Sequence, residues 1–82
     1  MKGFDSNKQS FKDNNFFDRN RLIIHALELH QKGNIQEAKR FYQKILKKGI
    51  ADPRVFTNLG VIFQMENDYE RAIKFFKKSV VE

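Results

Sequence analysis

Residues of matching size or turn preference recur in this chain at a constant separation of 34 positions. The matched pairs are Leu22 and Phe56, Ala26 and Gly60, Leu29 and Phe63, Gly33 and Asn67, Ile35 and Tyr69, Ala38 and Ala72, and Tyr42 and Phe76. Within each unit the apolar residues recur at spacings of three and four, the period of a helix with one buried face. A 34-residue period with two such segments predicts stacked helical hairpins. The expected fold is therefore all-α, with two antiparallel helix-turn-helix hairpins and no β-strand.

Turn residues divide each unit into two helices. Gly33 and Gly49 suit the left-handed conformation that often ends a helix, and Asn67 tolerates it better than most residues. The predicted helices cover about 19–32, about 35–48, the stretch from Pro53 to the residues before Asn67, and the stretch after Asp68 to the end of the chain.

A capping residue precedes each predicted helix. The candidate N-caps are Asp18, Asn34, Asp52 and Asp68, all short polar side chains preferred at this position. Asn34 is followed three residues later by Glu37, which indicates a capping box. Asp52 is followed by Pro53, which suits the first helical position because no N–H group is needed there.

The chain of 82 residues has room for one globular domain. We divide it into a flexible polar leader over 1–17 and a repeat domain over 18–82, with units at about 19–52 and 53–82. The absence of cysteine excludes disulfides and the usual structural zinc sites. Apolar runs such as Leu22–Ile24 are too short to span a bilayer, and the first residues lack a secretory signal. We expect a cytoplasmic protein.

Residues 19–82 resemble the tetratricopeptide repeat family. In the second unit, the family pattern is matched by Phe56, Leu59, Gly60 and Phe63, followed by Asn67, Tyr69, Ala72 and Phe76, with Phe in place of the usual Trp and first Tyr. The first unit is looser, since Leu22, His25, Ala26 and Leu29 stand where Trp, Leu, Gly and Tyr are usual. The resemblance implies a protein–protein interaction module or scaffold that holds a partner segment in a concave groove lined by the first helix of each repeat.

The groove implied by this resemblance is partly apolar. Its lining residues would be Asn20, Ile23, Leu27, His30, Gln31, Arg54, Thr57, Asn58, Val61, Gln64 and Met65. Four of these, Ile23, Leu27, Val61 and Met65, are not required by the hairpin pattern. Two interpretations stay open: they form an apolar floor for a partner segment, or they are additional core beneath the leader. Among the family's carboxylate-clamp positions only Asn58 is matched, which disfavours a receptor for C-terminal carboxylates.

The net charge of +6 lies entirely in residues 19–82, because the charges of residues 1–18 cancel. Basic residues on the second helix of each unit form a predicted stripe: Arg40, Lys44, Lys47, Lys48, Lys74, Lys77 and Lys78. The alternative function is therefore binding to nucleic acid or an anionic surface through this stripe. A solvated, lysine-rich helix face is the favoured interpretation, because lysine outnumbers arginine and no stacking aromatic residues are evident.

No catalytic or metal-binding pattern is present in the sequence, so we predict neither an enzyme nor a cofactor. The hydroxyl residues lack a partner histidine at a recognisable spacing. His25 and His30 lie five residues apart, about 140° around a helix, so they do not chelate one ion. We expect His25 to be a half-buried packing residue and His30 to be a polar residue of the groove or surface.

The last hairpin is expected to have an uncovered apolar edge, since stacked repeats bury their faces on neighbours and terminal units carry a polar cap. The predicted contributors are Phe63, Phe76, Val80 and Val81. A second copy, a partner chain or the remainder of a longer protein would cover this edge. Self-association as a homo-oligomer is the simplest expectation.

Overall fold

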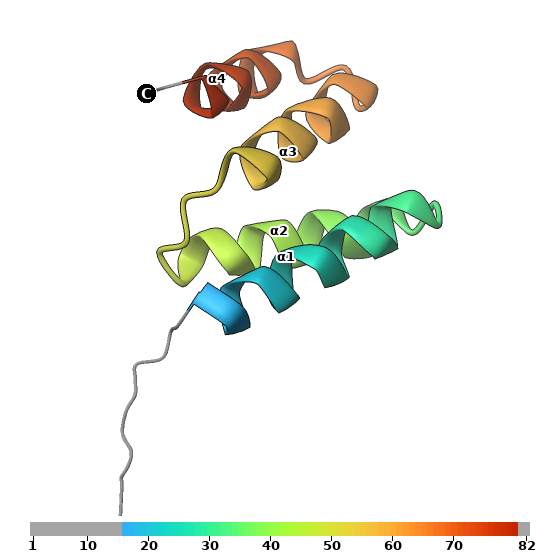
Figure 1. The fold of residues 1–82 in the computed structure, drawn as a ribbon. Coiled ribbons are helices and arrows are strands. Elements are labelled where there is room, and N and C mark those ends of the chain that lie inside the picture. The colour runs from blue at the N-terminus through green and yellow to red at the C-terminus, as the bar shows by residue number, and fades with distance from the viewer. Residues whose placement is uncertain (1–15, 81–82) are drawn as a thin grey trace, which may run out of the picture.

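The computed structural model describes residues 16–80 of the chain. It contains four helices: α1 (Phe16–Gln31), α2 (Ile35–Lys47), α3 (Pro53–Met65) and α4 (Tyr69–Ser79). Figure 1 shows two hairpins, α1 with α2 and α3 with α4, which are stacked through α2 and α3. The predicted all-α fold of two antiparallel hairpins is confirmed. None of the helices between residues 16 and 80 is long and apolar enough to cross a membrane.

The start of the first helix differs from the prediction. α1 begins at Phe16 and not at about 19, so the predicted flexible leader over 1–17 is wrong for Phe16 and Phe17. Asp18 lies inside the first turn and not at the cap, where its negative charge still favours the helix N-terminus. The rest of the leader lies outside the described residues. α2 and α3 match their predicted bounds to within one or two residues, the ordinary uncertainty of a helix end.

The helix ends use the predicted left-handed residues. Gly33, Gly49 and Asn67 have φ of 88°, 86° and 64°. After Gly33 the backbone N–H of Asn34 donates back to the carbonyl oxygen of Leu29 at 2.9 Å, and the same closure follows Asn67 and Gly49. These bonds satisfy carbonyl groups that a helix end leaves without partners. The three sharp turns between helices therefore follow from local backbone chemistry.

Besides Asp18, the predicted helix starts agree with the structure in two places and disagree in one. Oδ1 of Asp52 accepts a hydrogen bond from the backbone N–H of Arg54 at 2.9 Å, and Asp68 accepts one from Arg71 at 3.2 Å. The predicted capping box at Asn34 is wrong, because its side chain makes no cap hydrogen bond. Asp68 has similar backbone angles but is also held by the Arg71 guanidinium at 3.0 Å. The residue 34 positions before Arg71 is Glu37, which offers no such donor.

The core is made of large aliphatic side chains, Tyr42 and Phe63, together with small residues. Its largest fully buried members are Tyr42, Ile23, Ile45, Leu59, Ile62 and Val55. Ala26, Ala38, Ala72 and Gly60 are buried as well. A Cβ atom added at Gly60 would lie 2.6 Å from Cε1 of Phe76, closer than real contacts allow. α3 and α4 therefore approach each other closely at this glycine.

Polar contacts also join the two hairpins. Nζ of Lys39 on α2 lies 2.8 Å from Oε1 of Glu66, directly after α3, and 4.9 Å from the centre of the Phe63 ring. Nε2 of Gln36 donates to the same carboxylate at 3.2 Å. The hydrogen bonds from Lys39 and Gln36 lower the pKa of Glu66. Lys39 is thus part of the packing between repeats, with its stem on an aromatic ring and its charge paired.

Candidate partner-binding surfaces

The outward sides of α1 and α3 carry the residues predicted for the groove, with the exception of Ile23, and we call this surface the α1–α3 face. Thr57, Gln64, Met65, Gln31 and Arg54 are exposed, while Asn20, Leu27, His30, Asn58 and Val61 are half-buried. A hydrogen bond from Nη2 of Arg54 to Oδ1 of Asn20, 2.9 Å long, connects the two helices across the repeat boundary. The structure therefore brings side chains from both repeats together on this face.

Ile23 does not belong to the α1–α3 face. Only 1% of the residue is exposed, and it is a member of the central core. The physical reason is its position one turn before Ala26, on the buried side of α1. The remaining apolar positions stay accessible, since Met65 is 59% exposed and Leu27 and Val61 are half-buried. Ile23 is therefore core, Met65 is exposed, and Leu27 and Val61 are intermediate between the two interpretations.

The positive charge of Arg54 is paired with the carboxylate of Asp52. Its Nε donates to Oδ1 of Asp52 at 3.0 Å and its Nη2 donates to Oδ2 at 3.0 Å. These bonds lower the pKa of Asp52 and raise the pKa of Arg54. Asn58 uses its amide to donate to the carbonyl oxygen of Arg54 at 2.7 Å. The polar groups at this end of the face therefore hold the two repeats and the start of α3 in place.

His30 is tied to the core at the other end of α1. Its Nδ1 lies 3.2 Å from Oη of Tyr42, and the two rings meet edge to face at 5.9 Å. Burial raises the pKa of Tyr42 to about 12. The histidine thus supplies a hydrogen-bond partner for a buried phenol, and without that partner the buried hydroxyl group would destabilise the fold.

The predicted basic stripe is exposed along its whole length. All seven of its residues, Arg40, Lys44, Lys47, Lys48, Lys74, Lys77 and Lys78, are accessible to solvent. Arg40, Lys44 and Lys47 line a shallow hollow together with Gln43. Nζ of Lys44 lies 5.8 Å from the Phe41 ring centre and Nζ of Lys78 lies 5.9 Å from the Phe56 ring centre. Both rings are half-buried.

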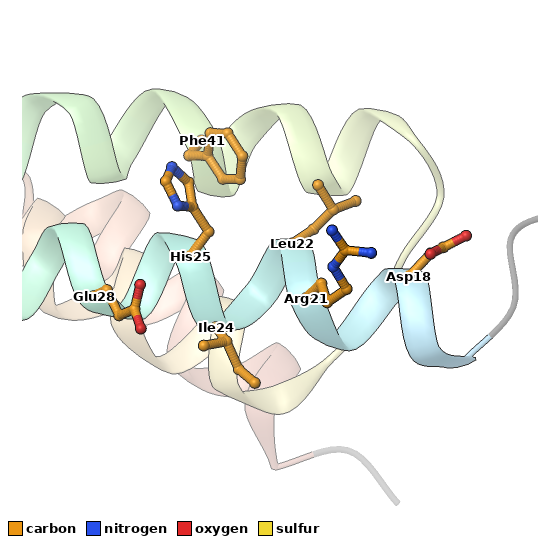
Figure 2. A pocket seen from close by; sticks show the side chains of 7 residues that line it. All are labelled: Asp18, Arg21, Leu22, Ile24, His25, Glu28 and Phe41. Atoms are coloured by element: carbon orange, nitrogen blue, oxygen red, sulfur yellow. The ribbon is translucent and has the colours of Figure 1, made fainter.

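A second hollow lies beside the first turns of α1 and was not predicted. Figure 2 shows its lining residues: Asp18, Arg21, Leu22, Ile24, His25, Glu28 and Phe41. Phe41 of α2 meets His25 edge to face, with ring centroids 4.8 Å apart. The expectation that His25 is half-buried is wrong, because it packs on Phe41 but remains exposed. The lining combines both charge signs with apolar groups and has no recognisable motif, so the sequence held no signal for it.

Comparison with known families gives a direct assignment. Family models of the tetratricopeptide repeat match residues 20–46 and 53–80, one for each hairpin. The chain belongs to the tetratricopeptide repeat family. Such repeats generally mediate protein–protein interaction and are typically not enzymes. No curated protein and no solved structure matches the chain.

Between residues 16 and 80, no three side chains of the His, Cys, Asp or Glu type gather where they would hold a metal ion.

The two tetratricopeptide repeats differ in how well their second helices are covered. On α4, Tyr69 is 58% exposed, Ile73 is 53% exposed and Val80, directly after the helix, is 72% exposed, with the half-buried Phe76 between them. We call these four residues the α4 face. The prediction that Phe63 contributes to this exposed edge is wrong, because Phe63 is only 3% exposed.

The sequence did not single out Tyr69 and Ile73, although the 34-residue offset held the signal. Their counterparts in the first tetratricopeptide repeat are Ile35, which packs against the core, and Lys39, which lies over Phe63 of the second repeat. Val81, the remaining residue predicted for the edge, lies outside the described part of the chain.

Proposed function

We propose that this protein is a non-catalytic interaction module that holds a segment of a partner protein on the α1–α3 face. The observation that carries the proposal is the exposure of Met65, at 59%, beside the half-buried Leu27 and Val61. Exposed apolar groups on a surface built from two repeats mark a contact site more often than scattered single residues do. Tetratricopeptide repeats generally mediate protein–protein interaction, which supports an interaction role.

The chemistry of the face favours an uncharged, partly apolar segment. Thr57, Gln64 and Gln31 are exposed hydrogen-bonding side chains without a partner among residues 16–80. They offer donors and acceptors to a peptide backbone, while the apolar residues accept alternate side chains. Arg54 is already paired with Asp52, so the face offers no free guanidinium for a carboxylate.

Substitution of the apolar residues tests this proposal. Leu27→Glu combined with Met65→Glu places two charges on the α1–α3 face, and we expect loss of the partners that the wild-type protein captures from native cytosol. Lys32→Glu is the matched control, since it lowers the net charge by the same amount at an exposed position outside the α1–α3 face and the basic stripe. Helical circular dichroism reports whether each variant folds. Equal capture by both folded variants would contradict the proposal.

The alternative function is binding to nucleic acid or to an anionic surface through the basic stripe. The hollow lined by Arg40, Lys44 and Lys47 supports it. Binding through phosphate contacts weakens steeply as salt rises, whereas contact with an apolar face does not. Titration of a duplex oligonucleotide at two salt concentrations separates the two functions, and nucleic acid is the less favoured partner because the neighbouring aromatic rings are half-buried.

We also propose that the protein self-associates through the α4 face, where Tyr69, Ile73 and Val80 are exposed. This surface is separate from the α1–α3 face, so a partner segment and a second copy do not compete for the same residues. Location in the cytoplasm stays a prediction from the sequence.

A further inference from the structure

The first repeat shows what the α4 face is built to contact. The residues 34 positions before Tyr69, Ile73, Phe76 and Val80 are Ile35, Lys39, Tyr42 and Leu46. Tyr42 is fully buried, Ile35 and Leu46 are half-buried against the core, and Lys39 lies over Phe63 of α3. All four positions are therefore packed in the first repeat. Their equivalents on α4 are more apolar at position 73, where isoleucine replaces lysine, yet Tyr69, Ile73 and Val80 are exposed and Phe76 is only half-buried.

A second copy does not fit this face by simple continuation of the stack. Val55 and Ile62 are fully buried on the side of α3 away from Gly60, and α2 is the other helix that α3 packs on. In the first repeat, Arg21 and Glu28 occupy the corresponding positions of α1, and both are exposed. Head-to-tail stacking would bury these two charged groups where Val55 and Ile62 lie, at a desolvation cost that apolar contacts do not repay.

The α4 face is instead complementary to itself. Tyr69, Ile73, Phe76 and Val80 follow the three- and four-residue spacing of a helical seam. Glu70 and Lys77 are seven residues apart, so they lie on the same flank of this seam two turns from each other. In the part of the chain that the structure describes, neither forms an ion pair. When two such helices pair antiparallel about a two-fold axis, residues of the same flank face each other. Glu70 of each copy then lies beside Lys77 of the other.

We infer that the protein forms a two-fold symmetric dimer in which the α4 helices of two copies pack antiparallel, with two symmetry-related Glu70–Lys77 ion pairs beside an apolar seam. This inference rests on the proposed self-association and specifies its partner and geometry. Figure 1 places α4 at the end of the stack away from α1, so the α1–α3 faces of both copies remain open. In this antiparallel arrangement the two helix dipoles point in opposite directions, which is electrostatically favourable. A dimer of this kind presents two partner-binding faces at once.

Sedimentation equilibrium from about 5 µM to about 500 µM protein tests the inference, since dimerisation is concentration-dependent. We expect the wild-type chain to pass from monomer to dimer across this range. Ile73→Glu is expected to stay monomeric with unchanged helical circular dichroism, because Ile73 is half exposed and outside the buried core. A wild-type chain that remains monomeric at the highest concentration overturns both the inference and the proposed self-association.

Charge reversal tests the geometry separately. Lys77→Glu places Glu beside Glu70 of the second copy at two sites, and we expect the dissociation constant to rise roughly tenfold. Lys74→Glu is the matched control: it changes the net charge by the same amount, but its position is well away from the seam, so dimerisation is unchanged or slightly stronger. Glu70→Lys combined with Lys77→Glu restores opposite charges and is expected to recover the wild-type constant. If Lys77→Glu and Lys74→Glu behave alike, self-association stands but the antiparallel geometry is wrong.

Discussion

Adding a single methyl group at Gly60 is a sharp test of the packing between α3 and α4. The ideal Cβ position lies 2.6 Å from Cε1, 2.7 Å from Cδ1 and 3.1 Å from Cζ of Phe76, whereas ordinary contacts begin at 3.4 Å. The whole edge of the ring must therefore retreat. Because Phe76 also packs against the core, its movement disturbs neighbouring side chains, and such overpacking costs about 1–3 kcal/mol.

Helix propensity acts in the opposite direction. Replacing glycine by alanine inside a helix stabilises it by about 1 kcal/mol. The steric cost is the larger effect, so we expect Gly60→Ala to lower the free energy of unfolding by about 1 kcal/mol net. Gly60→Leu adds three more carbons against the same ring and is expected to cost about 2–3 kcal/mol. For a domain of this size each kcal/mol shifts the melting temperature by about 4–8 °C.

Thermal unfolding followed by circular dichroism measures these changes. Thr57→Ala is the control, since Thr57 is exposed on the same helix and alanine there raises propensity without a steric cost. Phe76→Leu provides the second control: in that background, Gly60→Ala is expected to become neutral or stabilising because the ring edge is gone. A melting temperature for Gly60→Ala equal to or above that of the wild type would refute the steric argument.

Three further predictions concern the buried phenol, the ion pair between repeats and a turn glycine. Burial raises the pKa of Tyr42 to about 12, so this phenol ionises at a lower pH in the unfolded chain than in the folded one. Stability is therefore lost as pH rises above about 10. We expect the melting temperature to fall less between about pH 9 and about pH 11 in Tyr42→Phe than in the wild type. The pKa of Glu66 is lowered in the folded protein, so its pairing with Lys39 stabilises the fold above the unfolded-state pKa, and this stabilisation is lost as pH falls through the folded-state pKa. Glu66→Gln is expected to cost at most about 1 kcal/mol at neutral pH. An equal difference in melting temperature between this variant and the wild type at acidic pH would argue against the pairing. Gly33→Ala is expected to lower the free energy of unfolding by about 1–2 kcal/mol because of the φ of 88° alone, since the new Cβ meets nothing within 4 Å. Urea unfolding measures this change. An unchanged urea midpoint would show that the turn relaxes to another conformation.

Local chemistry made much of the fold predictable from the sequence. A left-handed residue at Gly33, Gly49 or Asn67 ends a helix regardless of what packs around it, and the caps at Asp52 and Asp68 depend on neighbours within three residues. The 34-residue offset then identified two equivalent hairpins. The exception at Asn34 has a local cause too, because an Asn lacks the charge that holds Asp68 to Arg71. The early start of α1 at Phe16 had no signal of this kind.

The candidate surfaces depended on tertiary packing. A helical pattern shows which residues share a side of a helix, but in a stack each helix has more than one side that a neighbour covers or leaves open. Ile23 lies in the core although the pattern allowed it to line the groove, and Phe63 lies under Lys39 and Phe75 although the pattern allowed it to be exposed. Tyr69 and Ile73 are exposed although their counterparts in the first repeat are covered. The burial of a side chain is decided by which helix lies against it, and that is a property of the assembled stack and not of any one helix.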